Sequence, residues 1–202
     1  MFKGEVLGDQ LKVSLKFFAS LFIIKLTLIV FFFSLFFLVF GIMPITERTK
    51  FLGKDELMIF LNVVVLAPII EEFIFRFHQN LKLKNILTSL GFSIFLFFGD
   101  FFLIILIVYF SFLLICQRLD IKISKIGVVY SSSILFSLGH LIQNHNLDFF
   151  ILNSHLILSF FPHFISALIL SFIFLNKGIK YSIFFHAFWN LFPFLMALIK
   201  LN

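Results

Sequence analysis

Charged residues are scarce in this chain: only 13% of its 202 residues are Asp, Glu, Lys or Arg, whereas 61% are hydrophobic. Soluble domains are about half apolar and about one quarter charged, so this composition excludes an ordinary soluble protein and indicates an integral membrane protein. Cysteine is nearly absent as well. Cys116 is the single one, which excludes an intrachain disulfide, and its place in an apolar run favours a packing role.

The sequence contains seven long runs without charged residues. Several of them reach or approach the roughly 20 residues that a membrane-spanning helix needs. We therefore expect an all-α, polytopic bundle of about seven transmembrane helices. The first run follows several lysines, as in a signal peptide, but it is too long and has no small-residue cleavage site, so we expect it to be retained. The uncharged runs are 26–46, 57–70, 85–99, 101–117, 126–147, 149–176 and 181–199.

The net charge of +6 does not indicate a nucleic-acid partner, because the basic residues are spread between the apolar runs and form no single patch. With seven helices, and with Arg76 set aside, eleven basic residues fall on one side of the membrane and four on the other. The positive-inside rule then places the N-terminus in the cytoplasm and the C-terminus outside. The larger group is Lys3, Lys12, Lys16, Lys25, Lys82, Lys84, Arg118, Lys122, Lys125, Lys177 and Lys180; the smaller is Arg48, Lys50, Lys54 and Lys200.

Two features suggest how the chain is organised. A polar segment, 47–56, separates the first helix from the rest, so we divide the chain into 1–56, a transmembrane helix with a polar loop, and 57–202, a helical core. Gly99 and Asp100 interrupt the region 85–117, which we interpret as a hairpin of two short helices.

The stretch APIIEEFIFR, residues 67–76, brings three charged residues into an apolar setting. Each ionisable residue at a membrane-helix centre costs roughly 2.5–3.5 kcal/mol on insertion scales, so such residues usually face a cavity and have a function. Glu72 and Arg76 are four residues apart with the acid first, the favourable order for an ion pair. Glu71 points about 100° away, so we expect it to face another pocket without a local partner, as a general base or acid does. A solvated ion cluster at the helix end is the alternative.

Two histidines lie deep in apolar runs, in FSLGH (136–140) and HAFWN (186–190). His186 and Asn190 are four residues apart and share a helix face, as do Phe136 and His140. A lone membrane histidine is often only an interhelical hydrogen-bond partner, but two of them together with Glu71 indicate a chemical site. The rise per residue places His140 nearer the middle of the membrane than Glu71 and His186, a difference that helix tilt would have to close.

Prolines and further histidines accompany these segments. Pro68 and Pro193 each remove a backbone hydrogen bond, so kinks there could open a cavity, although ordinary tolerated variation explains them equally well. The other four histidines are His78, His145, His155 and His163, and we expect a structural role for each of them. His155 and His163 are eight residues apart, so they could also line the same cavity.

In this order, the three motifs resemble those of the CPBP family, the CAAX-protease and bacteriocin-processing membrane enzymes also called the Abi family. The family pattern is EExxxR, then FxxxH, then HxxxN or HxxxD, each on its own transmembrane helix. Here the motifs are 71–76, 136–140 and 186–190, and the resemblance covers roughly 60–197. Two features depart from the family pattern. Phe77 stands where a glycine commonly follows the arginine. The gap between the first two motifs is longer than in the family, and 85–117, which we interpret as a helical hairpin, fills it.

The resemblance implies an intramembrane endopeptidase of a bacterial plasma membrane that acts on a membrane-associated protein or peptide. By that resemblance Glu71 would activate the attacking water and His140 would help to orient it. His186 and Asn190 would stabilise the oxyanion that develops on the scissile carbonyl. The catalytic residues would thus be Glu71, His140, His186 and Asn190.

Supporting roles would fall to Glu72, Arg76 and Phe136. The need for a metal stays open. The family is often labelled metalloprotease, and two histidines with a glutamate make a plausible zinc set that leaves one position for water. However, the chain has no HExxH motif, and a mechanism without metal has also been proposed for the family. The zinc ligands would be Glu71, His140 and His186.

Two other classes of function are compatible with the sequence. A non-catalytic membrane immunity or scaffold protein could keep the same fold and bind a peptide without cutting it, but it would not need all four candidate catalytic residues. A small transporter would also place carboxylates and histidines near the midplane, without these particular spacings. The sequence names no substrate.

Overall fold

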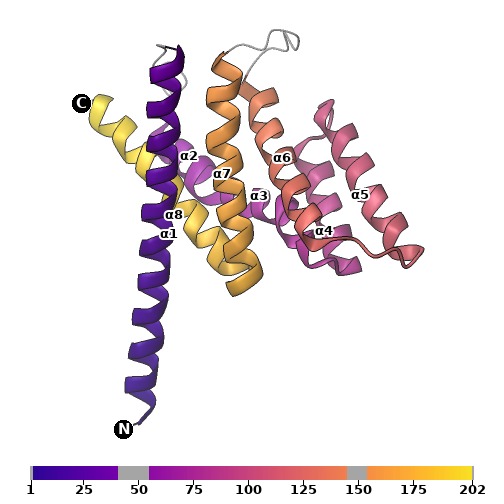
Figure 1. The fold of residues 1–202 in the computed structure, drawn as a ribbon, viewed down its shortest axis with the longest axis horizontal. Helices are drawn as coiled ribbons and strands as arrows, with labels where there is room; N and C mark the ends of the chain where they lie inside the picture. Colours follow the sequence, from indigo (N-terminus) through magenta and orange to yellow (C-terminus); the bar gives the residue numbers. More distant parts are fainter. Residues whose placement is uncertain (1, 41–54, 145–153, 202) are drawn as a thin grey trace. The chain divides into compact units, whose positions relative to one another are not determined.

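The structure is a computed structural model that describes residues 2–40, 55–144 and 154–201, and within these ranges every regular element is a helix (Figure 1). The all-α prediction is therefore confirmed. The chain divides into two compact units, Met1–Pro44 and Ile45–Asn202. Four stretches are long and apolar enough to cross a membrane, as expected of an integral membrane protein: Lys16–Leu35, Glu56–Asn80, Lys125–Ile142 and Ser159–Lys177.

The first unit contains helix α1, Phe2–Phe40. This helix begins well before Leu26, where the first uncharged run starts, because that run records only the absence of charge and lysine is itself a good helix former. Of the run 26–46, residues 41–46 lie outside the described residues, as does most of the polar segment 47–56. Ile23, Phe31 and Leu38 are exposed apolar side chains on α1.

The described part of the second unit has six helical stretches, which with α1 makes the seven expected from the sequence. The first is continuous over Glu56–Asn80 and changes its winding along the way. It consists of α2 (Glu56–Phe60), the π-helix η2 (Leu61–Leu66), α3 (Ala67–Phe75) and the 3-10 turn η3 (Phe77–Asn80). It is followed by α4 (Leu83–Leu96), α5 (Phe102–Arg118), α6 (Lys125–Asn144), α7 (Ser154–Lys177) and α8 (Ile179–Leu201).

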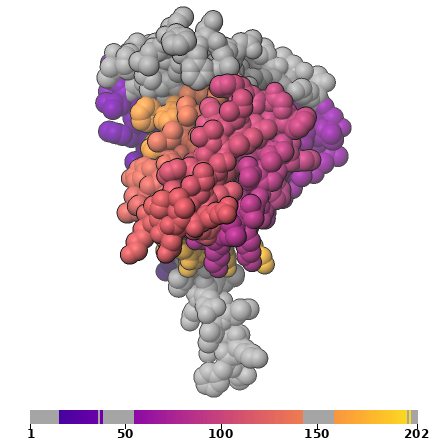
Figure 2. Space-filling model, turned by 90° about the vertical axis from the view of Figure 1, so that its right-hand side faces the viewer, coloured from indigo at the N-terminus to yellow at the C-terminus, as the bar shows by residue number. Residues whose placement is uncertain are grey.

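Helices α4 and α5 form a hairpin over the region 85–117. Gly99 adopts φ 84°, a left-handed conformation that suits glycine, and the Asp100 side chain accepts a 2.8 Å hydrogen bond from the N–H of Phe102 at the start of α5. Both helices are shorter than the other apolar helices that qualify as spans. Helix α4 packs on α5, and α5 lies beside α6 on one face of the unit (Figure 2), where Val108 and Phe112 of α5 are exposed.

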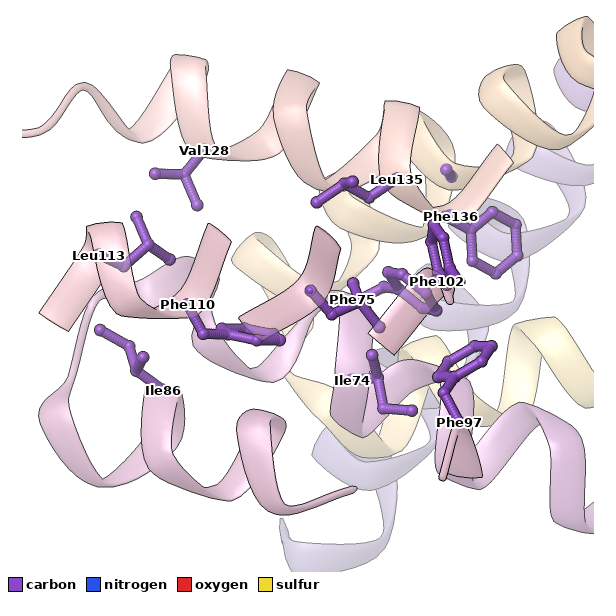
Figure 3. Close-up of a cluster of buried hydrophobic side chains, with 12 residues drawn as sticks. Ile74, Phe75, Ile86, Phe97, Phe102, Phe110, Leu113, Val128, Leu135 and Phe136 are labelled. Atoms are coloured by element: carbon purple, nitrogen blue, oxygen red, sulfur yellow. The ribbon is translucent and has the colours of Figure 1, made fainter. Parts of the chain in front are cut away.

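A cluster of buried apolar side chains fills the space among α3, α4, α5 and α6 (Figure 3). Phe75 comes from α3, Phe102 and Phe110 come from α5, and Phe136 comes from α6. Phe75 and Phe136 pack edge to face with 5.3 Å between ring centroids, a favourable geometry for an aromatic pair. Because these two rings belong to the first and second motif segments, the apolar core fixes those segments against each other.

Serine hydroxyls satisfy the last backbone carbonyls of α3 from neighbouring helices. Ser89 of α4 donates a 2.6 Å hydrogen bond to the carbonyl of Phe73, and Ser132 of α6 donates to the carbonyl of Phe75. An unpaired backbone group costs several kcal/mol in an environment without water. These bonds therefore favour one fixed placement of α4 and α6 around the end of α3.

Gly139 allows α5 and α6 to approach closely, which gives a stability prediction. A Cβ at residue 139 would lie 3.0 Å from Cε1 of Phe102, whose side chain is fully buried. Overpacking typically costs about 1–3 kcal/mol, which outweighs the ~1 kcal/mol that alanine gains over glycine in a helix. Gly139→Ala should therefore lower the thermal unfolding temperature in detergent. The matched control is Gly91→Ala on α4, where a Cβ meets nothing within 4 Å; an equal loss in both variants would contradict this packing.

The orientation expected from the basic residues gives a second prediction. In a variant with Cys116→Ser, a cysteine at Ser124, in the loop between α5 and α6, should react with an impermeant thiol reagent only from the cytoplasmic side. A cysteine at Lys54, just before the described start of the second unit, should react only from outside, because three helical stretches separate the two positions. Labelling of both from one side would show that α4 and α5 do not each cross the membrane.

Candidate active site

The three motif segments meet inside the second unit although they are far apart in the sequence. Glu71 lies on α3, His140 on α6 and His186 on α8. Glu71 Oε1 is 3.9 Å from Nε2 of His140, and Glu71 Oε2 is 3.7 Å from Nε2 of His186. The difference in depth expected from the rise per residue does not keep these three side chains apart.

Glu72 is fully buried, and both oxygens of its carboxylate have partners. Oε1 accepts a 3.0 Å hydrogen bond from Nδ1 of His186 and lies 3.6 Å from Nε of Arg76. Oε2 accepts a hydrogen bond from the hydroxyl of Ser182. The predicted ion pair of Glu72 and Arg76 is thus confirmed, and α8 adds two partners that the sequence did not indicate. Because a buried carboxylate is tolerated only with such compensation, Glu72 fastens α3 to α8.

The prediction that Glu71 and Glu72 face separate pockets was wrong. Both carboxylates approach the same imidazole, that of His186, Glu71 at Nε2 and Glu72 at Nδ1. The angle of 100° between successive helix residues describes the directions in which their side chains leave the backbone, not the positions of the side-chain ends. A glutamate side chain is long, and the two nitrogens of an imidazole lie on different edges of the ring, so one ring can bridge that angle.

Phe136 connects the charged residues of the site with the apolar core. Its ring centroid lies 4.2 Å from the guanidinium carbon of Arg76, a cation–π contact, and 4.4 Å from the ring of His140. Among the described residues none forms a hydrogen bond with the Arg76 nitrogens. The positive charge of this buried side chain is therefore compensated by Glu72 and by the face of Phe136.

Hydrogen bonds at Nδ1 determine which nitrogen of each histidine is turned toward Glu71. Nδ1 of His140 lies 3.0 Å from the carbonyl oxygen of Phe136, and since a carbonyl only accepts, this nitrogen carries a proton. The carboxylate of Glu72 places a proton on Nδ1 of His186 in the same way. Nε2 of each ring is left to face Glu71, and in the neutral tautomer it offers a lone pair there.

Glu71 differs from Glu72 in its access to the surroundings. Its side chain is 17% exposed and that of His140 is 24% exposed, whereas Glu72 is completely enclosed. The distances of 3.7 and 3.9 Å to the histidine nitrogens exceed those of a direct hydrogen bond. A water molecule could approach Glu71 and either nitrogen from the exposed side of this gap. Glu71 is thus the carboxylate that can exchange a proton with a bound molecule.

Asn190 is engaged at a different place. Its Nδ2 donates a 3.0 Å hydrogen bond to the carbonyl oxygen of Val63 in η2. In this π-helix the N–H of Ala67 bonds to the carbonyl of Asn62, five residues back, and Pro68 has no N–H to offer. The carbonyl of Val63 therefore accepts no backbone hydrogen bond from Ala67, whose N–H is already used, or from Pro68, which has no N–H. Asn190 satisfies it, so the contact docks α8 onto the π-helix.

The three prolines within or beside helical segments differ in their effect on the helix. Pro68 accompanies a change of helical winding just before Glu71, while α7 and α8 remain helical through Pro162 and Pro193. The expected pairing of Asn190 with His186 at one oxyanion is not what the described contacts favour, because the amide nitrogen of Asn190 is directed to Val63. A docking role explains this residue better.

His163 is a member of the site to which the sequence gave little weight. Its ring on α7 stacks on that of His140, with centroids 4.3 Å apart and planes 29° apart. The only sequence signal was its eight-residue spacing from His155, whose side chain lies outside the described residues. Helix α7 carries none of the three motifs, so only the packing of α7 on α6 reveals the contact.

The structural role expected for His78 is confirmed. Its Nδ1 lies 3.0 Å from the carbonyl oxygen of Ile74, and its Nε2 lies 2.9 Å from the hydroxyl of Tyr109 on α5. His78 is fully buried and so ties the hairpin to the end of α3. His145 lies outside the described residues.

A metal centre is not formed by the side chains as they are placed. In the ranges that the structure describes, no group of three or more His, Cys, Asp or Glu side chains is arranged to hold a metal ion. Glu71, His140 and His186 come nearest to such a set, with 3.9 and 3.7 Å between the carboxylate oxygens of Glu71 and Nε2 of the two histidines. The steps below use only the side chains of this protein.

Comparison with known proteins identifies no relative of this chain. No family model matches the sequence, and no curated protein or solved structure matches it either. The resemblance to the CPBP family therefore rests on the three motifs and stays a prediction.

The docking role of Asn190 can be tested by stability. Asn190→Leu keeps a similar volume but leaves the carbonyl of Val63 without a donor, which should cost about 1–3 kcal/mol and lower the unfolding temperature in detergent. The control is Asn176→Leu on α7, where the amide bonds only to Phe172 of its own helix and is exposed. Equal unfolding temperatures for Asn190→Leu and the wild type would contradict the docking role.

Proposed function

We propose that this protein is an intramembrane peptide hydrolase that cuts a peptide bond in a membrane-associated protein or peptide. The supporting observation is the contrast between two adjacent carboxylates. Glu72 is buried with both oxygens occupied, whereas Glu71 is partly exposed and faces Nε2 of His140 and His186. A general base needs a free oxygen within reach of a bound molecule, and Glu71 alone of the two has one.

Glu71 would act on a water molecule held beside its carboxylate and Nε2 of His140, within hydrogen-bond reach of both atoms, which lie 3.9 Å apart. As the water oxygen attacks the scissile carbonyl carbon, one water proton passes to Glu71. When the carbon–nitrogen bond breaks, that proton moves to the nitrogen of the leaving amine. The products are a new carboxyl terminus and a new amino terminus, so no other reactant is required.

His186 would stabilise the oxyanion formed in the attack. The carboxylate of Glu72 at its Nδ1 orients the ring, as a carboxylate does for the histidine of a catalytic triad. In its doubly protonated form His186 would donate from Nε2, which lies 3.7 Å from Glu71, to the oxyanion beside the attacking water.

The surroundings of the site favour this chemistry. Glu71 lies within the candidate span Glu56–Asn80 and His140 within Lys125–Ile142, so the reaction would take place at membrane depth. Exclusion of bulk water strengthens every electrostatic interaction in such a site. Backbone carbonyls of a helical substrate are already hydrogen-bonded. The substrate segment would therefore have to be extended or locally unwound where it is cut.

Glu71→Gln should abolish cleavage and leave the protein folded, because the amide keeps the size of the side chain and removes the basic oxygen. We expect turnover to fall by about 10²-fold or more, the usual contribution of a general base. The measurement is mass spectrometry of new N-termini in native membranes incubated with purified protein, alongside thermal unfolding in detergent.

Glu72→Gln is the matched control, since it makes the same chemical change one residue along. It leaves Arg76 without its anionic partner, a cost of roughly 3–5 kcal/mol for a buried pair, so folded protein and activity should be lost together. Wild-type turnover in Glu71→Gln would rule out its role as base, whereas an absence of new N-termini with the wild-type protein would favour a non-catalytic peptide-binding protein. An unchanged unfolding temperature in Glu72→Gln would show that the ion pair is solvated.

A further inference from the structure

We propose that His163 is a positioning residue that holds the imidazole of His140 in the orientation needed to place water beside Glu71. This inference rests on the proposed hydrolase activity. It assigns a function to a helix, α7, that carries none of the three motifs. The observation behind it is the stacking of the two imidazoles, 4.3 Å between centroids at 29°.

A single hydrogen bond does not fix His140. Its Nδ1 bond to the carbonyl of Phe136 anchors one atom, and the ring can still tilt about that atom. Phe136 contacts the ring at 4.4 Å and His163 at 4.3 Å. The centroids of Phe136 and His163 are 6.3 Å apart, so the two rings meet His140 from different sides. Together they restrict the tilt and keep Nε2 directed at Glu71.

His163 is itself held firmly enough to serve as a support. Its Nδ1 donates a 2.6 Å hydrogen bond to the carbonyl of Ser159, one turn earlier on α7. The next turn is also secured, because the hydroxyl of Ser166 donates a 2.7 Å hydrogen bond to the carbonyl of Pro162. The ring of His163 therefore takes its orientation from α7, and the packing of α7 on α6 passes that orientation to His140.

Stacking requires a flat ring at residue 163 and does not require its nitrogen atoms. His163→Phe should therefore preserve activity to within about threefold of the wild type, since phenylalanine also stacks. His163→Ala and His163→Leu should lower turnover by about tenfold or more, because a misplacement of about 1 Å can cost about 10²-fold. The leucine variant fills the space without a flat ring, which separates loss of stacking from loss of volume.

The experiment measures the rate at those cleavage sites that wild-type protein produces in native membranes. A second readout does not depend on cleavage: the rate at which diethyl pyrocarbonate modifies His140, followed by peptide mass spectrometry. His140 should react faster in His163→Ala and His163→Leu than in His163→Phe. Leu175→Ala is the control on the same helix, since the side chain of Leu175 is exposed and its truncation should alter neither readout.

The outcomes separate this inference from the proposed function. If wild type and Glu71→Gln behave alike in cleavage, the proposed function fails, and the modification rates still report on the stacking. If Glu71→Gln is inactive but His163→Ala cleaves and is modified like the wild type, His163 has no positioning role. If His163→Phe is as slow as His163→Ala, the imidazole nitrogens are required and a stacking role is overturned.

Discussion

The second unit depends on the compensation of one buried charge, that of Glu72. An ion of this size is costly to remove from water, and only close partners make its burial tolerable. Arg76 lies on the same stretch of chain, but the hydrogen-bond donors His186 and Ser182 come from α8. The contacts that make the carboxylate tolerable thus bind α3 to α8. They also deliver Nε2 of His186 to Glu71, so the stability of the fold and the geometry of the site have one origin.

Aromatic rings extend this constraint to the other helices. Phe136 belongs to the apolar core and also contacts Arg76 and His140, so the ring that helps to bind α6 to α3 also defines the wall of the site. The α4–α5 hairpin is part of the same scaffold. Phe102 of α5 supports α6 directly at Gly139, one residue before His140, and is fully buried there.

The departure at residue 77 has a local explanation. Where the motif pattern that this chain resembles commonly continues with glycine, Phe77 begins the 3-10 turn η3 and packs edge to face on Phe73, with 5.1 Å between centroids. Its neighbour His78 bonds to Tyr109 of the hairpin. The packing after Arg76 therefore involves both α3, through Phe77, and the α4–α5 hairpin, through His78.

The sequence by itself determined the helical class, the number of helices and the pairing of Glu72 with Arg76, because these follow from composition, periodicity and spacing within a single helix. That Glu71, His140 and His186 share a site was predicted from the three motifs taken together. Only the tertiary structure decided that Glu71 and Glu72 meet one imidazole, that Asn190 completes the π-helix at Val63, and that His163 stacks on His140. Each of these contacts joins two helices. Spacing along one helix gives the face on which a residue lies, but not the neighbour that this face meets.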